Sequence, residues 1–181
     1  MRPSAFTSIR NAVRRFRRNR SGSAAVEFAV VAPVFFALLF AIIETAIVFF
    51  AGQVLETVTQ DSARMIMTGQ AQTGGYSQGQ FKDYVCSRIN VLFDCVNGIY
   101  VDVQSYPAFT NVSITDPIDG SKNFIPAMQY SPGGPGDIVV VRLFYQWPLF
   151  VTGLGYNISN LNGSKRLLAA TAAFRNEPYG S

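Results

Sequence analysis

The sequence has few side chains that could act as nucleophiles, metal ligands or redox groups. Its two cysteines are the first of them. Cys86 and Cys95 lie nine positions apart, and they form either a disulfide or two free buried thiols, depending on the redox compartment. The sequence contains no histidine. This excludes nucleophilic catalysis by Ser–His or Cys–His systems, and two cysteines without a histidine do not make a metal site.

The acidic residues and the glycine-rich turns offer no second catalytic set. The sequence has neither a phosphate-binding G-x-x-x-x-G-K-[ST] loop nor a dinucleotide-binding G-x-G-x-x-G motif. Asp116, Asp119 and Asp137 surround a glycine-rich stretch and could hold calcium. Their spacing is not that of an EF-hand, however, and turn-forming aspartates are the more ordinary interpretation. We therefore expect a protein that is not an enzyme and that has no cofactor and no metal.

Glu27 is the acidic residue that most needs an explanation, because it lies within a long apolar run. Residues 24–51 contain no polar side chains other than Glu27, Glu44 and Thr45. As a helix this run would be about 42 Å long, more than the roughly 30 Å hydrocarbon core of a bilayer. A carboxylate in such a helix costs about 2.5 to 3.5 kcal/mol on insertion scales. Glu27 should therefore have a partner or a role, unless it simply lies at the interface near the arginines.

The distribution of charge predicts how this helix crosses the membrane. Seven of the 15 basic residues are arginines in residues 1–22, which contain no acid, so the remaining eight basic residues face 11 acidic ones. Basic segments stay on the cytoplasmic side, which places the C-terminal part across the membrane. A cleaved secretory signal has a shorter apolar core, and no A-x-A site follows this run. Outside the cytoplasm, Cys86 and Cys95 are expected to form a disulfide. We expect no nucleic-acid binding, because the basic charge is confined to this arm.

The periodicity of the apolar residues predicts the elements that follow. Leu55, Val58, Met65 and Ile66 recur near the helical period, so the apolar helix should continue to about residue 67. Further along, alternation and turn residues predict a polar linker, a short helix, a long loop and several strands. These are a linker at 69–80, a helix at 81–93, strands at 99–104, 110–114 and 137–147, a loop at 115–136, and a strand or alanine-rich helix at 164–174.

The expected fold is α+β, with a long N-terminal helix packed against an antiparallel sheet of three to five strands, as in pilins. A basic cytoplasmic leader occupies residues 1–22, and the long helix occupies residues 23–68, transmembrane in about 24–51. The linker 69–80 then leads to a periplasmic α+β domain at residues 81–181. Among its aromatic residues, Tyr145, Trp147 and Phe150 are candidates for a contact between subunits.

The residues around Glu27 also form a recognisable pattern. Gly22, Ser23, Glu27 and Phe28 resemble the processing site of type IV prepilins, in which a basic leader ends in glycine and the fifth mature residue is glutamate. Together with Pro33 and the pair at 43–44, the sequence over about residues 15–67 is similar to the TadE-like family of minor pilins, or pseudopilins. This family belongs to the tight-adherence (Flp) pilus, within the type IV pilin superfamily.

The resemblance implies a function in assembly. A prepilin peptidase would cut after Gly22, and Glu27 of a neighbouring subunit could neutralise the new α-amino group of Ser23. The expected partners are this peptidase, other pilins and pilus assembly components of the inner membrane, and the lipid bilayer. The expected location is the inner membrane, single-pass, with the possibility of incorporation into the extracellular pilus. The alternative is an uncleaved single-pass anchor that carries a periplasmic binding domain.

Overall fold

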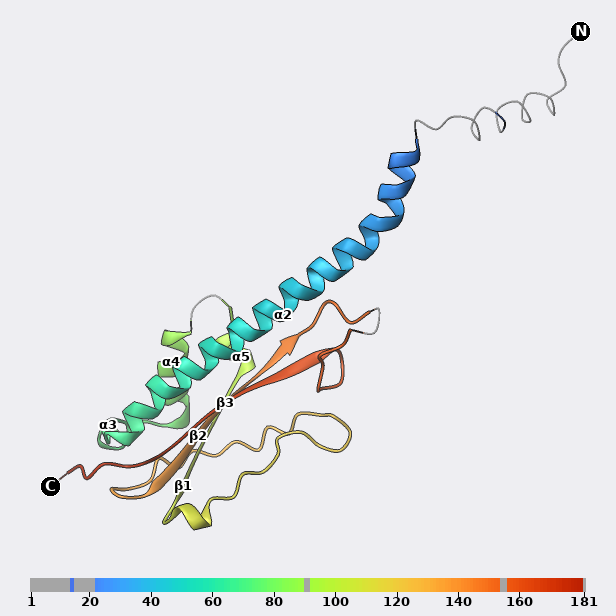
Figure 1. Cartoon of the computed structure of the whole chain (residues 1–181). Coiled ribbons are helices and arrows are strands. Elements are labelled where there is room, and N and C mark those ends of the chain that lie inside the picture. Colours follow the sequence, from blue (N-terminus) through green and yellow to red (C-terminus); the bar gives the residue numbers. More distant parts are fainter. Residues whose placement is uncertain (1–13, 15–21, 90–91, 154–155, 181) are drawn as a thin grey trace, which may run out of the picture. The chain divides into compact units, whose positions relative to one another are not determined.

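The computed structural model describes residue 14 and residues 22–89, 92–153 and 156–180 (Figure 1). Most of the basic leader that the sequence predicts at residues 1–22 therefore lies outside the described residues. The described elements follow one another as α2 (Ser23–Met67), α3 (Gln70–Thr73), α4 (Gln78–Arg88), α5 (Cys95–Gly98), β1 (Ile99–Tyr106), η1 (Phe109–Asn111), β2 (Ile138–Pro148) and β3 (Lys165–Arg175). A long N-terminal helix followed by a small antiparallel sheet is the α+β layout expected from the sequence.

Helix α2 is one uninterrupted helix of 45 residues, which continues through Pro33. Its C-terminal end is set by Gly69, which has a positive φ of 75° and donates its N–H to the carbonyl oxygen of Ile66. A glycine in this left-handed conformation is a common helix stop, because a Cβ is unfavourable there. The carbonyl oxygen of Met67 accepts the N–H of Glu177, so the C-terminal tail also covers the end of the helix.

The chain divides into two compact units, residues 1–42 and residues 43–181, and the division falls inside α2. In the second unit, one face of α2 is buried at positions three or four residues apart. This buried stripe contains Val48, Ala51, Leu55, Val58 and Ile66. The amphipathic half of the helix that the sequence predicts is therefore present, and its apolar face belongs to the core of the second unit.

The sheet of the second unit has the strand order β1-β2-β3, and both pairs are antiparallel (Figure 1). Alternate residues of the three strands, such as Val101, Leu143 and Ala170, share one buried cluster with side chains of α2 and α4. A smaller cluster around Phe144 and Leu167 lies on the other face. The C-terminal half of α2 and α4 thus cover one face of the sheet, and the other face carries a second, smaller core.

Residues 165–175 form a strand and not the alternative alanine-rich helix. Leu168, Ala170 and Ala172 are buried, whereas Ala169 and Thr171 between them are exposed. Alanine favours helices in isolation, but pairing along the full length of β2 outweighs that preference here. Small side chains on this strand also leave room for the bulky side chains of the helices packed on the sheet.

Two other local expectations are corrected by the structure. The linker at 69–80 contains the short helix α3, and α4 begins earlier than expected because Ser77 and Gln80 form a capping box. Residues 110–114 do not form a strand: a 3₁₀ turn occupies Phe109–Asn111, and Phe109 and Ile114 are exposed. Their alternating pattern is short and has no neighbouring strand with which to pair, so it does not become part of the sheet.

Candidate functional site: the start of helix α2 and its junction with the C-terminal domain

The first turn of α2 brings together the residues predicted to form a processing site. Helix α2 begins at Ser23, and the N–H of Val26 donates to the carbonyl oxygen of Gly22 at 3.1 Å. The Ser23 hydroxyl donates to Oε1 of Glu27 at 2.9 Å, one turn further along. Gly22 is thus the residue at the boundary of the helix, and Ser23 and Glu27 lie on one face of it.

The fold itself does not require a glycine at position 22. A Cβ added to Gly22 would have no heavy atom within 4 Å, and Gly22 is not among the glycines with a positive φ. This differs from Gly69, where a Cβ would lie 2.2 Å from the Tyr179 ring and φ is positive. Neither packing nor backbone conformation therefore explains the choice of glycine at the boundary.

Glu27 has an exposed side chain on an apolar segment. The neighbouring Phe28 is 69% exposed, and large apolar side chains remain exposed along most of α2 up to Phe50. Among the described residues, the ion pairs are Arg88–Asp61 and Arg142–Asp102, so Glu27 has no cationic partner in that part of the chain.

The same helix has the length and composition of a membrane span. One helix in the described part of the chain, α2, is long and apolar enough to cross a bilayer, and almost none of its most apolar window is buried. Residues 23–43, if they form the span, would be about 31 Å long at 1.5 Å per residue, close to the roughly 30 Å hydrocarbon core. The apolar run is therefore consistent with membrane anchoring.

Glu44, which the sequence analysis used only as part of the family resemblance, has contacts that the sequence did not predict. Glu44 is only 8% exposed. Its carboxylate accepts the backbone N–H groups of Phe150 and Val151, which lie 106 and 107 positions further along the chain. Phe150 donates to Oε1 at 2.5 Å, and Val151 donates to Oε1 at 3.2 Å and to Oε2 at 3.1 Å. The hydroxyl groups of Thr45 and Tyr156 form a further hydrogen bond beside it. The signals in the sequence were a second acid within the apolar run and its place in the TadE-like pattern.

A buried ion pair inside the sheet was missed as well. Arg142 on β2 donates from Nε and Nη2 to Oδ2 of Asp102 on β1, at 2.9 and 2.7 Å. The other carboxylate oxygen accepts the N–H of Gln129, and Nη1 of Arg142 donates to the carbonyl oxygen of Thr115. Both side chains are buried, and the pair ties the long loop after β1 to the sheet. The arrangement is structural, because all of its contacts are satisfied within the fold.

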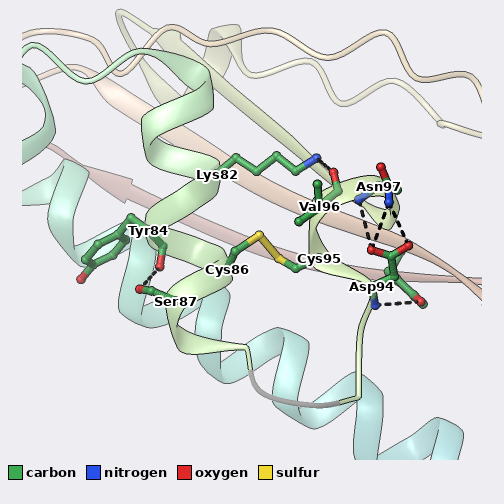
Figure 2. Close-up of a disulfide and its surroundings, with 9 residues drawn as sticks. Lys82, Tyr84, Cys86, Ser87, Asp94, Cys95, Val96 and Asn97 are labelled. Carbon is green, nitrogen blue, oxygen red and sulfur yellow. Dashed lines mark hydrogen bonds between the residues drawn. A yellow bond between two sulfur atoms is a disulfide. The ribbon is translucent and has the colours of Figure 1, made fainter.

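Cys86 and Cys95 are joined by a disulfide, with their Cα atoms 5.6 Å apart (Figure 2). Cys86 lies on α4 and Cys95 is the first residue of α5, so the bond links two short helices that lead into β1. Lys82 donates from Nζ to the carbonyl oxygen of Val96 at 2.8 Å, and Asp94 caps α5 by accepting the N–H of Asn97. These contacts hold the segment that precedes the sheet.

The three aspartates considered for calcium accept backbone N–H groups of their own turns. Oδ1 of Asp116 accepts from Ile118, Oδ1 of Asp119 accepts from Asn123, and Oδ2 of Asp137 accepts from Gly134. The hydrogen bond from the Asn123 backbone is the main reason why the pKa of Asp119 is lowered. In the ranges that the structure describes, no three His, Cys, Asp or Glu residues are grouped as metal ligands would be.

Comparison with known proteins gives one match. The family model described as TadE-like protein matches residues 22–64, which run from the boundary glycine almost to the end of α2. No curated protein matches the chain, and no solved structure matches it either. The match includes Glu27 and Glu44 but not the disulfide or the sheet. It confirms the resemblance found in the sequence: residues 22–64 of the chain are similar to the TadE-like protein family.

Proposed function

We propose that this chain is a minor pilin, or pseudopilin, needed for assembly of an adhesive tight-adherence pilus, and that a prepilin peptidase matures it by cutting after Gly22. It is not an enzyme in this proposal. The N-terminal leader lies in the cytoplasm and the C-terminal domain in the periplasm. For the membrane span we propose residues 23–43, shorter than the 24–51 expected from the sequence, because Glu44, Val48 and Ala51 are buried in the C-terminal unit. Its partners are the peptidase, other pilins and assembly components, and the lipid bilayer.

The observation that carries the proposal is the arrangement of Gly22, Ser23 and Glu27 at the first turn of α2. A Cβ at position 22 would meet no heavy atom within 4 Å, so packing does not explain this glycine, and recognition by the peptidase is the reason that we propose for it. Cleavage after Gly22 would convert the first residue of the helix into the N-terminus. The new α-amino group would then be a cation at the end of an apolar helix.

The Glu27 carboxylate is the anion that would pair with this amine, and it would do so in a neighbouring subunit. A free Ser23 amine and the Glu27 carboxylate of an adjacent subunit would pair in an apolar environment, where two separate charges are costly. The exposed apolar side chains of α2, such as Phe28, Val31 and Phe35, would pack against sister helices around this pair. Assembly then depends on packing and charge pairing and involves no chemical step by this protein.

The test is the mass of the protein purified after expression together with its prepilin peptidase. The proposal expects a mature N-terminus at Ser23, and it expects Gly22→Lys to remain full length. Gly52→Lys is a matched control, because Gly52 lies in the same helix and a Cβ there also has no heavy atom within 4 Å. Wild-type protein that stays full length with the peptidase present, or Gly22→Lys that is still cut, would instead favour an uncleaved anchor.

A further inference from the structure

The loop that Glu44 binds is held in an unusual way. Residues 149–153, which we name the Phe150 loop, follow β2 directly. The backbone N–H groups of Phe150 and Val151 both point to the Glu44 carboxylate, and Leu149 is buried. The loop is therefore fixed by its backbone, and the Phe150 side chain is left 86% exposed. Phe150 is the most exposed of the large apolar side chains in the described part of the chain.

The position of this loop along the axis of α2, relative to the proposed membrane span, indicates what Phe150 contacts. If residues 23–43 fill the hydrocarbon core, Glu44 is the first residue beyond it. Ile47, Phe49 and Phe50 lie about 5 to 10 Å further along the helix axis and are also exposed. The headgroup region adds roughly 5 to 8 Å on each side of a bilayer. The Phe150 loop and these helix side chains therefore lie at the depth of the lipid headgroups.

The composition of the same end of the sheet agrees with this depth. Trp147 pairs with Arg166 across β2 and β3, and Pro148 pairs with Lys165. Lys165 is exposed and Arg166 is half-buried. Residues 147–156 contain no charged side chain. Trp147 packs on Phe93 and Tyr145 in the core, and Nη1 of Arg166 donates to the carbonyl oxygen of Ile158. The exposed Lys165 is therefore the cation beside the uncharged loop, and a basic side chain beside an apolar segment is typical of the membrane–water interface.

We propose that the Phe150 loop is a membrane-docking loop, which inserts Phe150 among the lipid headgroups on the periplasmic side and which Glu44 holds at that depth. This inference rests on the proposed span by α2. Its consequence is that the C-terminal domain contacts the bilayer through a second point besides the helix. The domain is then restrained against rotation and tilting relative to the membrane surface.

Single cysteines in the full-length chain test the proposal, because the two natural cysteines are bonded to each other. Phe150→Cys, Phe109→Cys and Phe36→Cys are each labelled with a bimane fluorophore. All three positions are exposed phenylalanines: Phe36 lies in the proposed span, and Phe109 lies in η1. The proteins are reconstituted in vesicles of phosphatidylethanolamine and phosphatidylglycerol, with and without nitroxide-labelled lipid. Iodide serves as the quencher in water.

The proposal expects a blue-shifted emission and quenching by nitroxide lipid at positions 150 and 36, with the larger shift at 36. At position 109 it expects quenching by iodide alone. If the label at position 150 is quenched by iodide alone, as at position 109, while the label at position 36 is quenched by nitroxide lipid, the docking loop is wrong and the proposed span still stands. If position 36 also behaves like position 109, both ideas are wrong. A label at 150 that is shielded only when a second copy is present would point to a subunit contact and overturn docking to lipid.

A second variant tests the part assigned to Glu44. In the Phe150→Cys background, Glu44→Gln replaces a carboxylate with an amide that has a single acceptor oxygen, so the N–H groups of Phe150 and Val151 lose part of their binding site. We expect quenching by nitroxide lipid to fall and quenching by iodide to rise at position 150, while the Cys86–Cys95 disulfide stays formed. Unchanged quenching would overturn the role of Glu44 in holding the loop.

Discussion

The two halves of helix α2 use the same residue types for opposite purposes. In residues 23–42 the apolar side chains are exposed, and Glu27 accepts a hydrogen bond from Ser23 in its own helix. In residues 43–67 the apolar stripe is buried, and the Glu44 carboxylate is bound by the backbone of a distant loop. In the described residues, the apolar side chains of the first half are exposed and those of the second half are buried within the C-terminal unit.

This difference separates the residues that stabilise the domain from those available for assembly. A glutamate whose partners lie in its own fold should affect the free energy of unfolding when it is changed. A glutamate whose partner lies in another subunit should affect assembly and leave the domain as stable as before.

The largest effect is expected at the buried ion pair of the sheet. Asp102→Ala should lower the free energy of unfolding by about 3 to 5 kcal/mol, because it leaves the Arg142 guanidinium buried without its carboxylate. The measurement is denaturant unfolding of the full-length protein in detergent, followed by the fluorescence of its single tryptophan. The double variant Asp102→Leu/Arg142→Met should recover much of the loss, since no unpaired charge remains. A loss as large in the double variant would contradict the charge argument.

The disulfide should have the next largest effect. Replacing both Cys86 and Cys95 with serine should cost about 2 to 3 kcal/mol, because the bond closes a short loop in the unfolded chain. The same unfolding experiment measures this, and a reducing agent added to the wild-type protein should give a similar loss. A full-length protein equally stable with and without the bond would show that α4 and α5 are held by packing alone.

Glu44 gives the central test of the comparison. Glu44→Gln should cost about 1 to 3 kcal/mol, because the buried N–H groups of Phe150 and Val151 lose part of their acceptor. Glu56→Gln is the matched control, since Glu56 lies on the same helix and is exposed, and it should change stability by less than about 0.5 kcal/mol. Equal effects of the two variants would break the distinction between the buried and the exposed acids of α2.

Glu27 should have the smallest effect on the domain and the largest on assembly. Glu27→Gln should change the free energy of unfolding by less than about 0.5 kcal/mol, because its described partner is an exposed hydroxyl on its own helix. Membrane insertion should be retained, and the number of pili on the cell surface should fall strongly. Counting pili by electron microscopy, with membrane fractionation as the control, measures both. Normal piliation would remove the proposed pairing with Ser23 of a neighbour.

Local patterns predicted much of the secondary structure. The apolar run and its helical continuation correspond to α2, and alternating residues correspond to β1 and β2. Residues 110–114 were wrongly predicted as a strand: they alternate like one but have no partner strand. Residues 164–174, for which the sequence left strand and helix open, form a strand because they pair along β2. A pattern shows what a segment prefers, and its neighbours in the fold decide whether that preference is met.

The candidate site was predicted unevenly for a related reason. Gly22, Ser23 and Glu27 lie within six consecutive residues, and their spacing together with the basic leader and the apolar run made them recognisable. Glu44 meets its partners across 106 residues, and Asp102 meets Arg142 across 40, so no local spacing connects them. Their roles emerge only when the sheet is assembled against the helix.

The amino-acid order by itself therefore determined the apolar helix, its charge asymmetry and the motif at its start, because each arises from residues close together in the chain. The tertiary structure alone decided that Glu44 anchors the Phe150 loop, that Asp102 and Arg142 are buried as a pair, and that residues 165–175 are a strand. The physical reason is that a buried carboxylate or an alanine-rich segment takes its role from the partners that the fold brings to it.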